Sequence, residues 1–272
     1  MGAQLDLRSL KQNMPDFLDR LAKDALDTIK SGYYKEKIRI SNNEPLNLKK
    51  SLMHAEGNPI IAEIKAASPS KGSIKENINS VKLAELMMNG GAAGLSVLTE
   101  PKHFNGSIKY VSDIQAVHSY PILMKDFILS KAQVKTARKI GASAVLLIST
   151  LYNRGYGEIG LESMIDLVHK EGLEVLLETH SIEEFKTGIN TDADLIGINN
   201  RDLKTLETDI KVTESILRQV EPAGKIVVSE SGIKNASDII FLRNCGAKAF
   251  LVGSSIMESD DPQSKVKELV NA

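Results

Sequence analysis

Residues 121–148 read PILMKDFILSKAQVKTARKIGASAVLLI and contain one complete strand–helix–strand unit. The apolar run PILM opens it. The segment at 130–141 then places Val134, Ala137 and Ile140 on one helical stripe and ends at a glycine. The run AVLLI closes the unit. Apolar residues at consecutive positions are typical of parallel strands covered on both faces, so this segment predicts a parallel α/β fold.

The same alternation recurs along the chain. Eight short apolar runs are candidate strands: IIAEI from Ile60, GLSVL from Gly94, PILM from Pro121, AVLLI from Ala144, EVLLE from Glu174, LIGI from Leu195, KIVVS from Lys225 and AFLVG from Ala249. Helix signals lie between them, namely Ser80 as an N-cap with Gly90 as a stop, an S-x-x-E capping box from Ser181 to Glu184, and Asp261-Pro262. A doubly wound open sheet would give the same local pattern. Eight units with polar residues at nearly every strand end favour a closed (β/α)8 TIM barrel.

Residues 1–59 precede the first candidate strand. Within them, MPDFLDRLAKDALDTIK has Pro15 near its start and Gly32 after its end. One helical face of this segment carries Phe17, Leu18, Leu21, Ala25 and Ile29. We expect an extra helix packed on the barrel. The chain is therefore predicted to be a single TIM-barrel domain over 1–272, with an N-terminal helical extension at 1–59 and the barrel at 60–272.

Composition excludes several classes of protein. The formal net charge of -1 gives no global attraction to nucleic acid or to an anionic membrane. The first residues, MGAQLDLRSLKQ, lack the apolar stretch typical of a signal peptide, and no apolar run reaches about 18 residues, so we expect neither a signal peptide nor a membrane-spanning helix. The single cysteine, Cys245, excludes an intramolecular disulfide, fits a reducing compartment and is expected in the core. We expect a soluble cytoplasmic protein without membrane or nucleic-acid partners.

The histidines do not form a metal motif. They are scattered along the chain without ligand spacing: His54, His103, His118, His169 and His180. We therefore expect no metal and no cofactor. His180 follows Glu178 by two residues and could line the barrel rim, but the start of the following helix is the favoured interpretation. The pair Met87 and Met88 is expected in the core.

Charged residues at the strand ends form the first chemical signal. Glu63 and Lys65 are two apart at the end of the first strand, so both point into the barrel mouth. Lys125 follows four apolar residues, with Phe127 on the same side. Desolvation there is expected to lower the pKa of Lys125, which would help it donate a proton near neutrality.

Later strands add further polar ends. Glu178 ends the fifth strand, Asn199 ends the sixth with Arg201 two residues on, and Glu230 with Ser231 ends the seventh. A single charged residue at a strand end is most often solvated on the rim. Because several ionisable groups converge on one rim, an active site is the better interpretation.

A second signal follows the last two strands. Ser231 and Gly232 come after the seventh strand, and Gly253 and Ser254 come after the eighth. Barrels often bind phosphate at this place through backbone N–H groups, and glycine allows the backbone to approach the anion closely. One such glycine is a weak signal because many only make turns. The pair on neighbouring strands predicts a phosphate site.

Longer motifs carry a specific resemblance. The runs IAEIKAASPSKG, LSVLTEPKHFNGS, PILMKDFI, IGINNRDL, VSESGI and FLVGSSIM resemble those of the indole-3-glycerol-phosphate synthase family. The resemblance extends from Ile60 to about Met257, and the N-terminal helix is similar to that family's extension. Two departures stand out. Ala66 follows Lys65 where many family members have a second lysine, and the glycine-rich stretch over 149–160 looks long, as a surface loop or, less favoured, a mobile lid.

The resemblance implies a role for each matching position. Lys125 would be the general acid, Glu178 its acid/base partner, and Lys65 the group that binds the substrate carboxylate and assists proton transfer. Glu63 and Asn199 would orient the lysines and the substrate, and Phe104 and Phe127 would flank its aromatic ring. The rest of the wall is implied to comprise Ser68, Arg201, Glu230 and Ser231, with Ser231, Gly232, Gly253 and Ser254 on the phosphate.

The implied reaction needs no cofactor. It converts 1-(2-carboxyphenylamino)-1-deoxyribulose 5-phosphate into indole-3-glycerol phosphate, carbon dioxide and water. The division of acid and base roles between Lys65 and Lys125 in the dehydration step stays open. Rival interpretations are another phosphate-binding barrel enzyme, such as an isomerase or a Schiff-base aldolase using Lys125, and a non-catalytic barrel scaffold. The expected partner is a small phosphorylated substrate, and the expected state is a monomer or a weak homo-oligomer.

Overall fold

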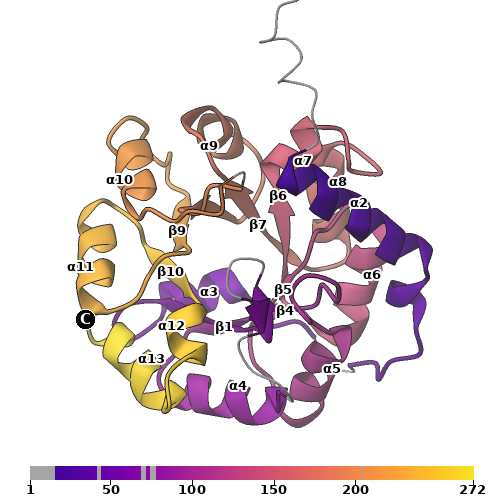
Figure 1. The fold of residues 1–272 in the computed structure, drawn as a ribbon, viewed down its shortest axis with the longest axis horizontal. Coiled ribbons are helices and arrows are strands. Elements are labelled where there is room, and N and C mark those ends of the chain that lie inside the picture. The colour runs from indigo at the N-terminus through magenta and orange to yellow at the C-terminus, as the bar shows by residue number, and fades with distance from the viewer. Residues whose placement is uncertain (1–15, 42–43, 69–71, 74–77, 204) are drawn as a thin grey trace, which may run out of the picture.

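Eight parallel strands close into a barrel with helices around it (Figure 1). The computed structural model describes residues 16–41, 44–68, 72–73, 78–203 and 205–272. The barrel strands are β1 (Ile60–Ile64), β4 (Gly94–Leu98), β5 (Ile122–Lys125), β6 (Ala144–Ile148), β7 (Glu174–Thr179), β8 (Leu195–Asn199), β9 (Ile226–Glu230) and β10 (Ala249–Val252). β1 pairs with both β10 and β4, which closes the ring. The predicted (β/α)8 barrel is confirmed.

Helices connect the strands on the outside. They are α4 (Ser80–Asn89), α5 (Ile108–Val117), α6 (Lys131–Ile140), α8 (Leu161–Lys170), α9 (Ile182–Gly188), α10 (Lys211–Leu217), α11 (Ala236–Asn244) and α13 (Pro262–Val270). Shorter elements are η1 (Tyr33–Lys35), α3 (Leu48–Met53), α7 (Ser149–Asn153), α12 (Ser254–Met257) and the hairpin of β2 (Ala67–Ser68) with β3 (Gly72–Ser73). Within the described ranges, none of these helices combines the length and apolar character needed to cross a membrane.

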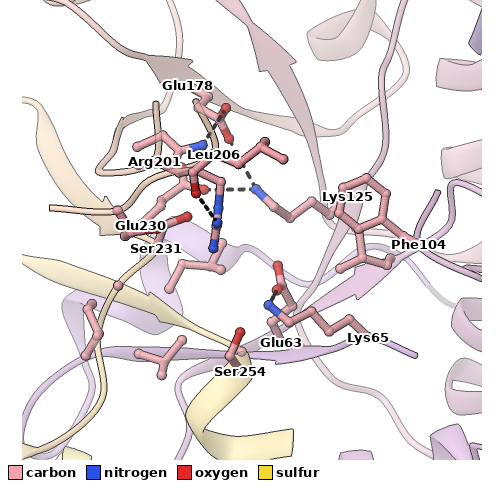
Figure 2. Close-up of a pocket in the computed structure, with 18 of the residues that line it drawn as sticks. Glu63, Lys65, Phe104, Lys125, Glu178, Arg201, Leu206, Glu230, Ser231 and Ser254 are labelled. Carbon is pink, nitrogen blue, oxygen red and sulfur yellow. Dashed lines mark hydrogen bonds and ion pairs between the residues drawn. The ribbon is translucent and has the colours of Figure 1, made fainter. Parts of the chain in front are cut away.

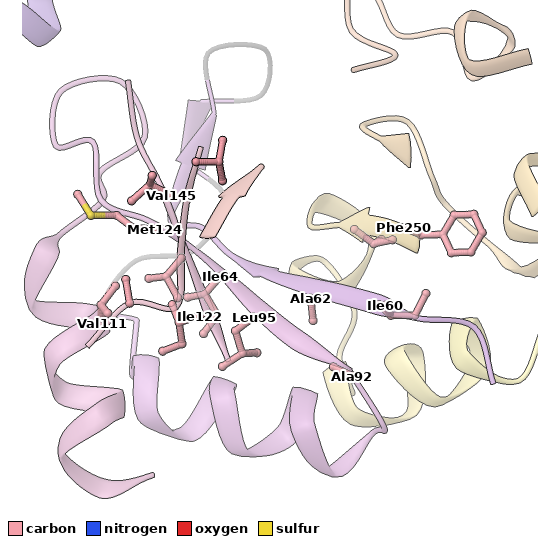
Figure 3. Packing of buried hydrophobic residues seen from close by; sticks show 14 of the residues in the cluster. Ile60, Ala62, Ile64, Ala92, Leu95, Val111, Ile122, Met124, Val145 and Phe250 are labelled. Carbon is pink, nitrogen blue, oxygen red and sulfur yellow. The ribbon is translucent and has the colours of Figure 1, made fainter. Parts of the chain in front are cut away.

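Alternate residues of each strand enter different cores. Ile60, Ala62 and Ile64 of β1 pack outward in the large cluster between strands and helices (Figure 3). Ile61 points the other way and packs in a second cluster inside the barrel. Glu63 follows Ile61 by two residues and so continues the inward row. The barrel interior is therefore apolar below and polar at the carboxyl ends of the strands.

The N-terminal helix α2 (Phe17–Lys30) packs on the barrel, as predicted. Leu18 and Leu21 are buried in the inner cluster. Arg154, on the segment after α7, lies 2.8 Å from the Asp16 carboxylate and 2.7 Å from that of Asp19. This double ion pair fixes the start of α2 beside α7 (Figure 1). Pro15, predicted to lie near the start of this helix, is outside the described residues.

Part of the segment over 149–160, which was expected to be a surface loop, is helical. Its first part forms α7, and Tyr156 after it donates its hydroxyl to Asp19 at 2.9 Å. The Glu158 backbone N–H donates to the Leu129 carbonyl at 2.7 Å. The segment thus begins with a short helix. The residues after it are hydrogen-bonded to α2 and to the stretch that follows β5.

Four local expectations need correction. Asn79 rather than Ser80 caps α4, because the Asn79 side chain accepts the Lys82 N–H at 3.0 Å. Of the capping box predicted at Ser181, only the hydrogen bond from the Glu184 N–H to the Ser181 side chain forms, because the Glu184 carboxylate accepts the His180 N–H instead. Cys245 is half-buried rather than in the core, because it is the C-cap residue that follows the last turn of α11. Met87 is fully buried, whereas its neighbour Met88 is only partly so.

Candidate active site

A cavity of about 670 Å³ opens at the carboxyl ends of the strands. Every site residue proposed from the sequence lines it except Ser68, whose side chain is not among those described. The cavity floor is formed by inward-facing apolar residues of the barrel, including Leu146 and Leu251. One wall is formed by Phe17, Leu18 and Leu21 of α2. The sequence predicted that α2 packs on the barrel but not that it lines the site.

Lys125 lies between two buried carboxylates. Its Nζ is 2.9 Å from Glu230 Oε2 and 3.2 Å from Glu178 Oε2 (Figure 2). The Lys125 side chain is 17% exposed, whereas those of Glu178 and Glu230 are 3% and 1% exposed. Each of the three residues lies at the end of its own strand, so only the closed barrel brings them together.

The expected pKa shift of Lys125 was wrong in direction. Burial alone lowers the pKa of this ammonium group, but the negative charges of Glu230, Glu178 and Glu63 outweigh burial and raise it above its ordinary value. Lys125 is therefore a firmly held cation. The burial of the lysine could be predicted from the apolar run before it, whereas the two carboxylates beside it could not.

The two carboxylates differ in their protonation. Burial raises the pKa of Glu230 to about 7, assisted by the charge of Glu178 and opposed by Lys125. Glu178 is also buried, but Lys125, His180 and Asn199 together hold its pKa well below the usual range. Glu178 is thus ionised, while Glu230 titrates near neutrality. The pKa values of two carboxyl groups that share one lysine are driven apart in this way.

A second polar pair faces the first across the cavity. Lys65 Nζ lies 2.9 Å from Glu63 Oε1, and both side chains are nearly buried (Figure 2). The hydroxyl of Ser96 donates to Glu63 Oε2 at 3.4 Å. Gly253 lies directly beneath this pair, because a Cβ built on it would contact Glu63 and would lie 2.9 Å from Lys65 Nζ. The glycine therefore gives room to the ion pair.

The segments after β8, β9 and β10 complete the rim. The guanidinium of Arg201 donates to the Leu206 carbonyl at 2.8 Å (Figure 2). Ser231 and Gly232 both have positive φ, 67° and 85°, so the chain turns sharply after β9. Gly253 and Ser254 begin α12 at the end of β10. The four residues predicted to bind phosphate thus all line the cavity.

Two aromatic rings also line the cavity. The rings of Phe104 and Phe127 lie 6.1 Å apart at an interplanar angle of 55°. Phe104 is on the loop after β4, and the sequence did not show what holds that loop. The carboxylate of Glu100, 1% exposed, accepts the backbone N–H groups of Lys102, His103 and Phe104 at 2.9, 2.7 and 3.1 Å. Three bonds to one buried carboxylate fix the position of Phe104.

Asp126 is a further buried acid that sequence reasoning missed. It accepts the Tyr34 hydroxyl at 2.9 Å and the Thr99 hydroxyl at 2.5 Å. Burial raises its pKa to about 7. Since η1 supplies Tyr34, this contact attaches the segment after α2 to the barrel beneath Lys125. In the described part of the chain, no group of three or more His, Cys, Asp or Glu side chains is arranged to hold a metal ion.

A closed (β/α)8 barrel with paired lysines and carboxylates at the carboxyl ends of its strands defines a barrel enzyme. The family model described as indole-3-glycerol phosphate synthase matches residues 19–269. The chain belongs to this family.

Named relatives agree with the family model. An indole-3-glycerol phosphate synthase of Methanocaldococcus jannaschii is 43% identical over 252 residues, which cover 91% of this chain and 92% of that protein. One of Carboxydothermus hydrogenoformans is 40% identical, with 85% and 88% covered.

Solved structures share the fold at much lower identity. Thiamine phosphate pyrophosphorylase from Pyrococcus furiosus has a TM-score of 0.57 at 16% identity and covers 82% of this chain and 96% of its own. A 3-hexulose-6-phosphate synthase has a TM-score of 0.59 at 14% identity, with 78% and 97% covered. These likenesses concern the barrel alone.

Proposed function

We propose that this chain is a carboxy-lyase of tryptophan biosynthesis that makes indole-3-glycerol phosphate. It closes the indole ring of 1-(2-carboxyphenylamino)-1-deoxyribulose 5-phosphate with loss of carbon dioxide and water. Family membership over residues 19–269 supports this reaction. The observation that carries it is the cavity in which Lys125 with two carboxylates faces Lys65 across a space lined by aromatic rings.

Ring closure is assigned to Lys125. As the aromatic carbon that bears the carboxylate attacks the ketone carbon, the ketone oxygen gains negative charge. The Lys125 ammonium stabilises this charge and protonates the oxygen. Its raised pKa suits donation to a strongly basic alkoxide rather than to a neutral ketone. Glu230, which titrates near pH 7 at 2.9 Å, is positioned to return a proton to the lysine.

Decarboxylation and dehydration are assigned to the other polar groups. Lys65 would hold the substrate carboxylate until carbon dioxide leaves, with Glu63 fixing the lysine at 2.9 Å. Ionised Glu178 would then take a proton, while Lys65 or Lys125 protonates the departing hydroxyl. Asn199 orients Glu178 through a 3.0 Å hydrogen bond. Backbone N–H groups at Ser231, Gly232, Gly253 and Ser254 would bind the phosphate, with Ser68 and Arg201 completing the wall.

Phe104 and Phe127 are proposed to flank the substrate's aromatic ring. Glu100→Gln is therefore expected to raise KM about 10-fold, because the amide cannot accept all three backbone N–H groups and charged hydrogen bonds contribute about 1.5–3 kcal/mol each. The value of kcat should change much less. Steady-state kinetics with Glu162→Gln, an exposed change on α8, as the control would check this. An unchanged KM would show that the loop does not depend on Glu100.

The reaction is tested by adding the carboxyphenylamino-deoxyribulose phosphate to the purified protein without metal or cofactor. We expect indole fluorescence to rise together with one equivalent of carbon dioxide. A substrate adduct trapped by borohydride would indicate a Schiff-base aldolase instead. Binding without conversion would indicate a scaffold.

The remaining assignments are also proposals. We infer one domain over 1–272, supported by the packing of α2 on the barrel interior. A monomer or weak homo-oligomer acting on a small phosphorylated substrate in the cytoplasm is in keeping with the net charge of -1 and a single cysteine.

A further inference from the structure

His180 lies between two carboxylates behind the barrel mouth. Its Nε2 is 3.1 Å from Glu178 Oε1, and its Nδ1 is 3.6 Å from Glu184 Oε2. The side chain is only 14% exposed. Burial by itself lowers the pKa of the imidazole, but the two carboxylates raise it to about 9. The ring is therefore a cation at neutral pH, although it lies nearly out of contact with solvent.

Glu184 is held firmly in place. It accepts the Thr150 hydroxyl from α7 at 2.6 Å and the backbone N–H of His180 at 2.8 Å. The side chain of Ser181 caps α9 by accepting the Glu184 N–H at 3.2 Å. In a capping box the Glu184 carboxylate would accept the Ser181 N–H. Here it accepts the N–H of the preceding residue, His180, and therefore lies against the His180 ring. Glu184 is fixed by two elements of the fold.

The arrangement determines which oxygen of Glu178 faces the cavity. Oε1 is engaged by Asn199 at 3.0 Å and by His180 at 3.1 Å. Oε2 is left for Lys125 at 3.2 Å. A carboxylate that is held by one oxygen presents the other in a fixed direction, which is what proton transfer requires.

We propose that His180, held by Glu184, is a positioning residue that fixes Glu178 with Oε2 toward Lys125 and the substrate. This inference rests on the function proposed above and deepens it. His180 itself does not line the cavity. Its effect on the reaction passes through Glu178.

The charged surroundings of His180 predict a pH dependence. The acidic groups next to it are Glu178 from β7 and Glu184 from α9, and Lys125 from β5 lies beyond Glu178. The neighbouring α7 and β8 contribute the uncharged Thr150 and Asn199. Both acids favour the charged ring, so it is protonated below about pH 9 and neutral above it. Removing one acid should let His180 lose its proton at lower pH.

Glu184→Gln tests this directly. We expect the alkaline limb of kcat to move about two pH units down from its position in the unaltered enzyme. At pH 8 kcat should fall about 10-fold, whereas at pH 6 it should stay within about 2-fold, since the histidine is then charged in both enzymes. KM should change little across the range. A merely structural role for Glu184 would lower activity without moving the limb.

The matched control is another histidine–carboxylate pair. His118 at the end of α5 lies 3.0 Å from Glu85 of α4, outside the barrel mouth. Glu85→Gln should leave the pH profile unchanged. A profile that shifts equally in this variant would overturn the inference.

Two changes at position 180 cover the case in which Glu184→Gln fails to fold. His180→Gln keeps an N–H donor that does not titrate, so it should retain part of kcat and flatten the alkaline limb. His180→Leu has no donor and should lose about 10-fold more kcat than His180→Gln at pH 7, at equal thermal stability. Equal kcat in the two variants, or an unmoved limb in a folded Glu184→Gln, would overturn the proposal. An unaltered enzyme with no turnover would instead overturn the function on which it rests.

Discussion

Lys125→Met is expected to lower kcat about 10³-fold, within the range that one acid–base group contributes. Methionine keeps most of the length of the side chain but removes the charge that stabilises and protonates the developing alkoxide. It also leaves Glu178 and Glu230 facing each other without a cation. Such a pair cannot stay doubly ionised in a buried site, so one carboxyl should take up a proton. The product's indole fluorescence measures the loss.

Lys131→Met is the control for this change. Lys131 begins α6 and forms a half-exposed pair with Glu158 at 3.6 Å, outside the cavity. Its replacement should leave turnover as it was. Near-normal turnover in Lys125→Met would show that Lys125 is not the acid. Loss of the native circular dichroism signal would instead show that this variant does not fold.

Gly253→Ala is expected to reduce kcat/KM about 100-fold with little effect on stability. The added methyl group would collide with Glu63 and approach Lys65 Nζ to 2.9 Å. The two nearest atoms, Glu63 Oε1 and Lys65 Nζ, are the free ends of flexible side chains, so the fold can adjust while the ion pair is displaced. A shift of about 1 Å in a catalytic group can by itself cost about 100-fold in rate. Kinetics and thermal unfolding of the same preparation separate the two effects.

Gly160→Ala provides the comparison. Gly160 has no atom within 4 Å of the position where a Cβ would be added, and its φ is -61°. Alanine there should leave both activity and stability unchanged. Equal kcat/KM for the two alanine variants would contradict the role given to Gly253.

The barrel could be predicted from the sequence because its signals are local. Each strand is a short run of consecutive apolar residues, because a parallel strand that is buried on both faces carries apolar side chains on both. The inward direction of Glu63, Lys125, Glu178 and Glu230 also follows from the two-residue repeat of a strand. The strand-end part of the cavity lining could therefore be predicted from residues up to 190 positions apart, as the closeness of Glu63 to Gly253 illustrates.

What depends on distances across the barrel could not be predicted. The pKa of Lys125 was expected to fall because burial was known and its partners were not. Those partners are 53 and 105 positions away along the chain. His180 was interpreted as the start of the following helix in preference to a rim residue, since nothing local shows that Glu184 turns back onto it. Glu100 accepts hydrogen bonds from backbone groups of its own loop, and Asp126 accepts them from two hydroxyl groups. The pattern of apolar residues does not predict the position of any of these donors.

The division of charge between the two halves of the barrel has a consequence for folding. Lys65 directly follows β1 and Lys125 ends β5, whereas Glu178 and Glu230 come from β7 and β9. During synthesis the lysines emerge well before these carboxylates, and β1 gains its partner β10 only at the end. Such distant pairings form slowly because the loop must close first. The active centre is thus among the last parts to assemble, and only a closed barrel can bind substrate.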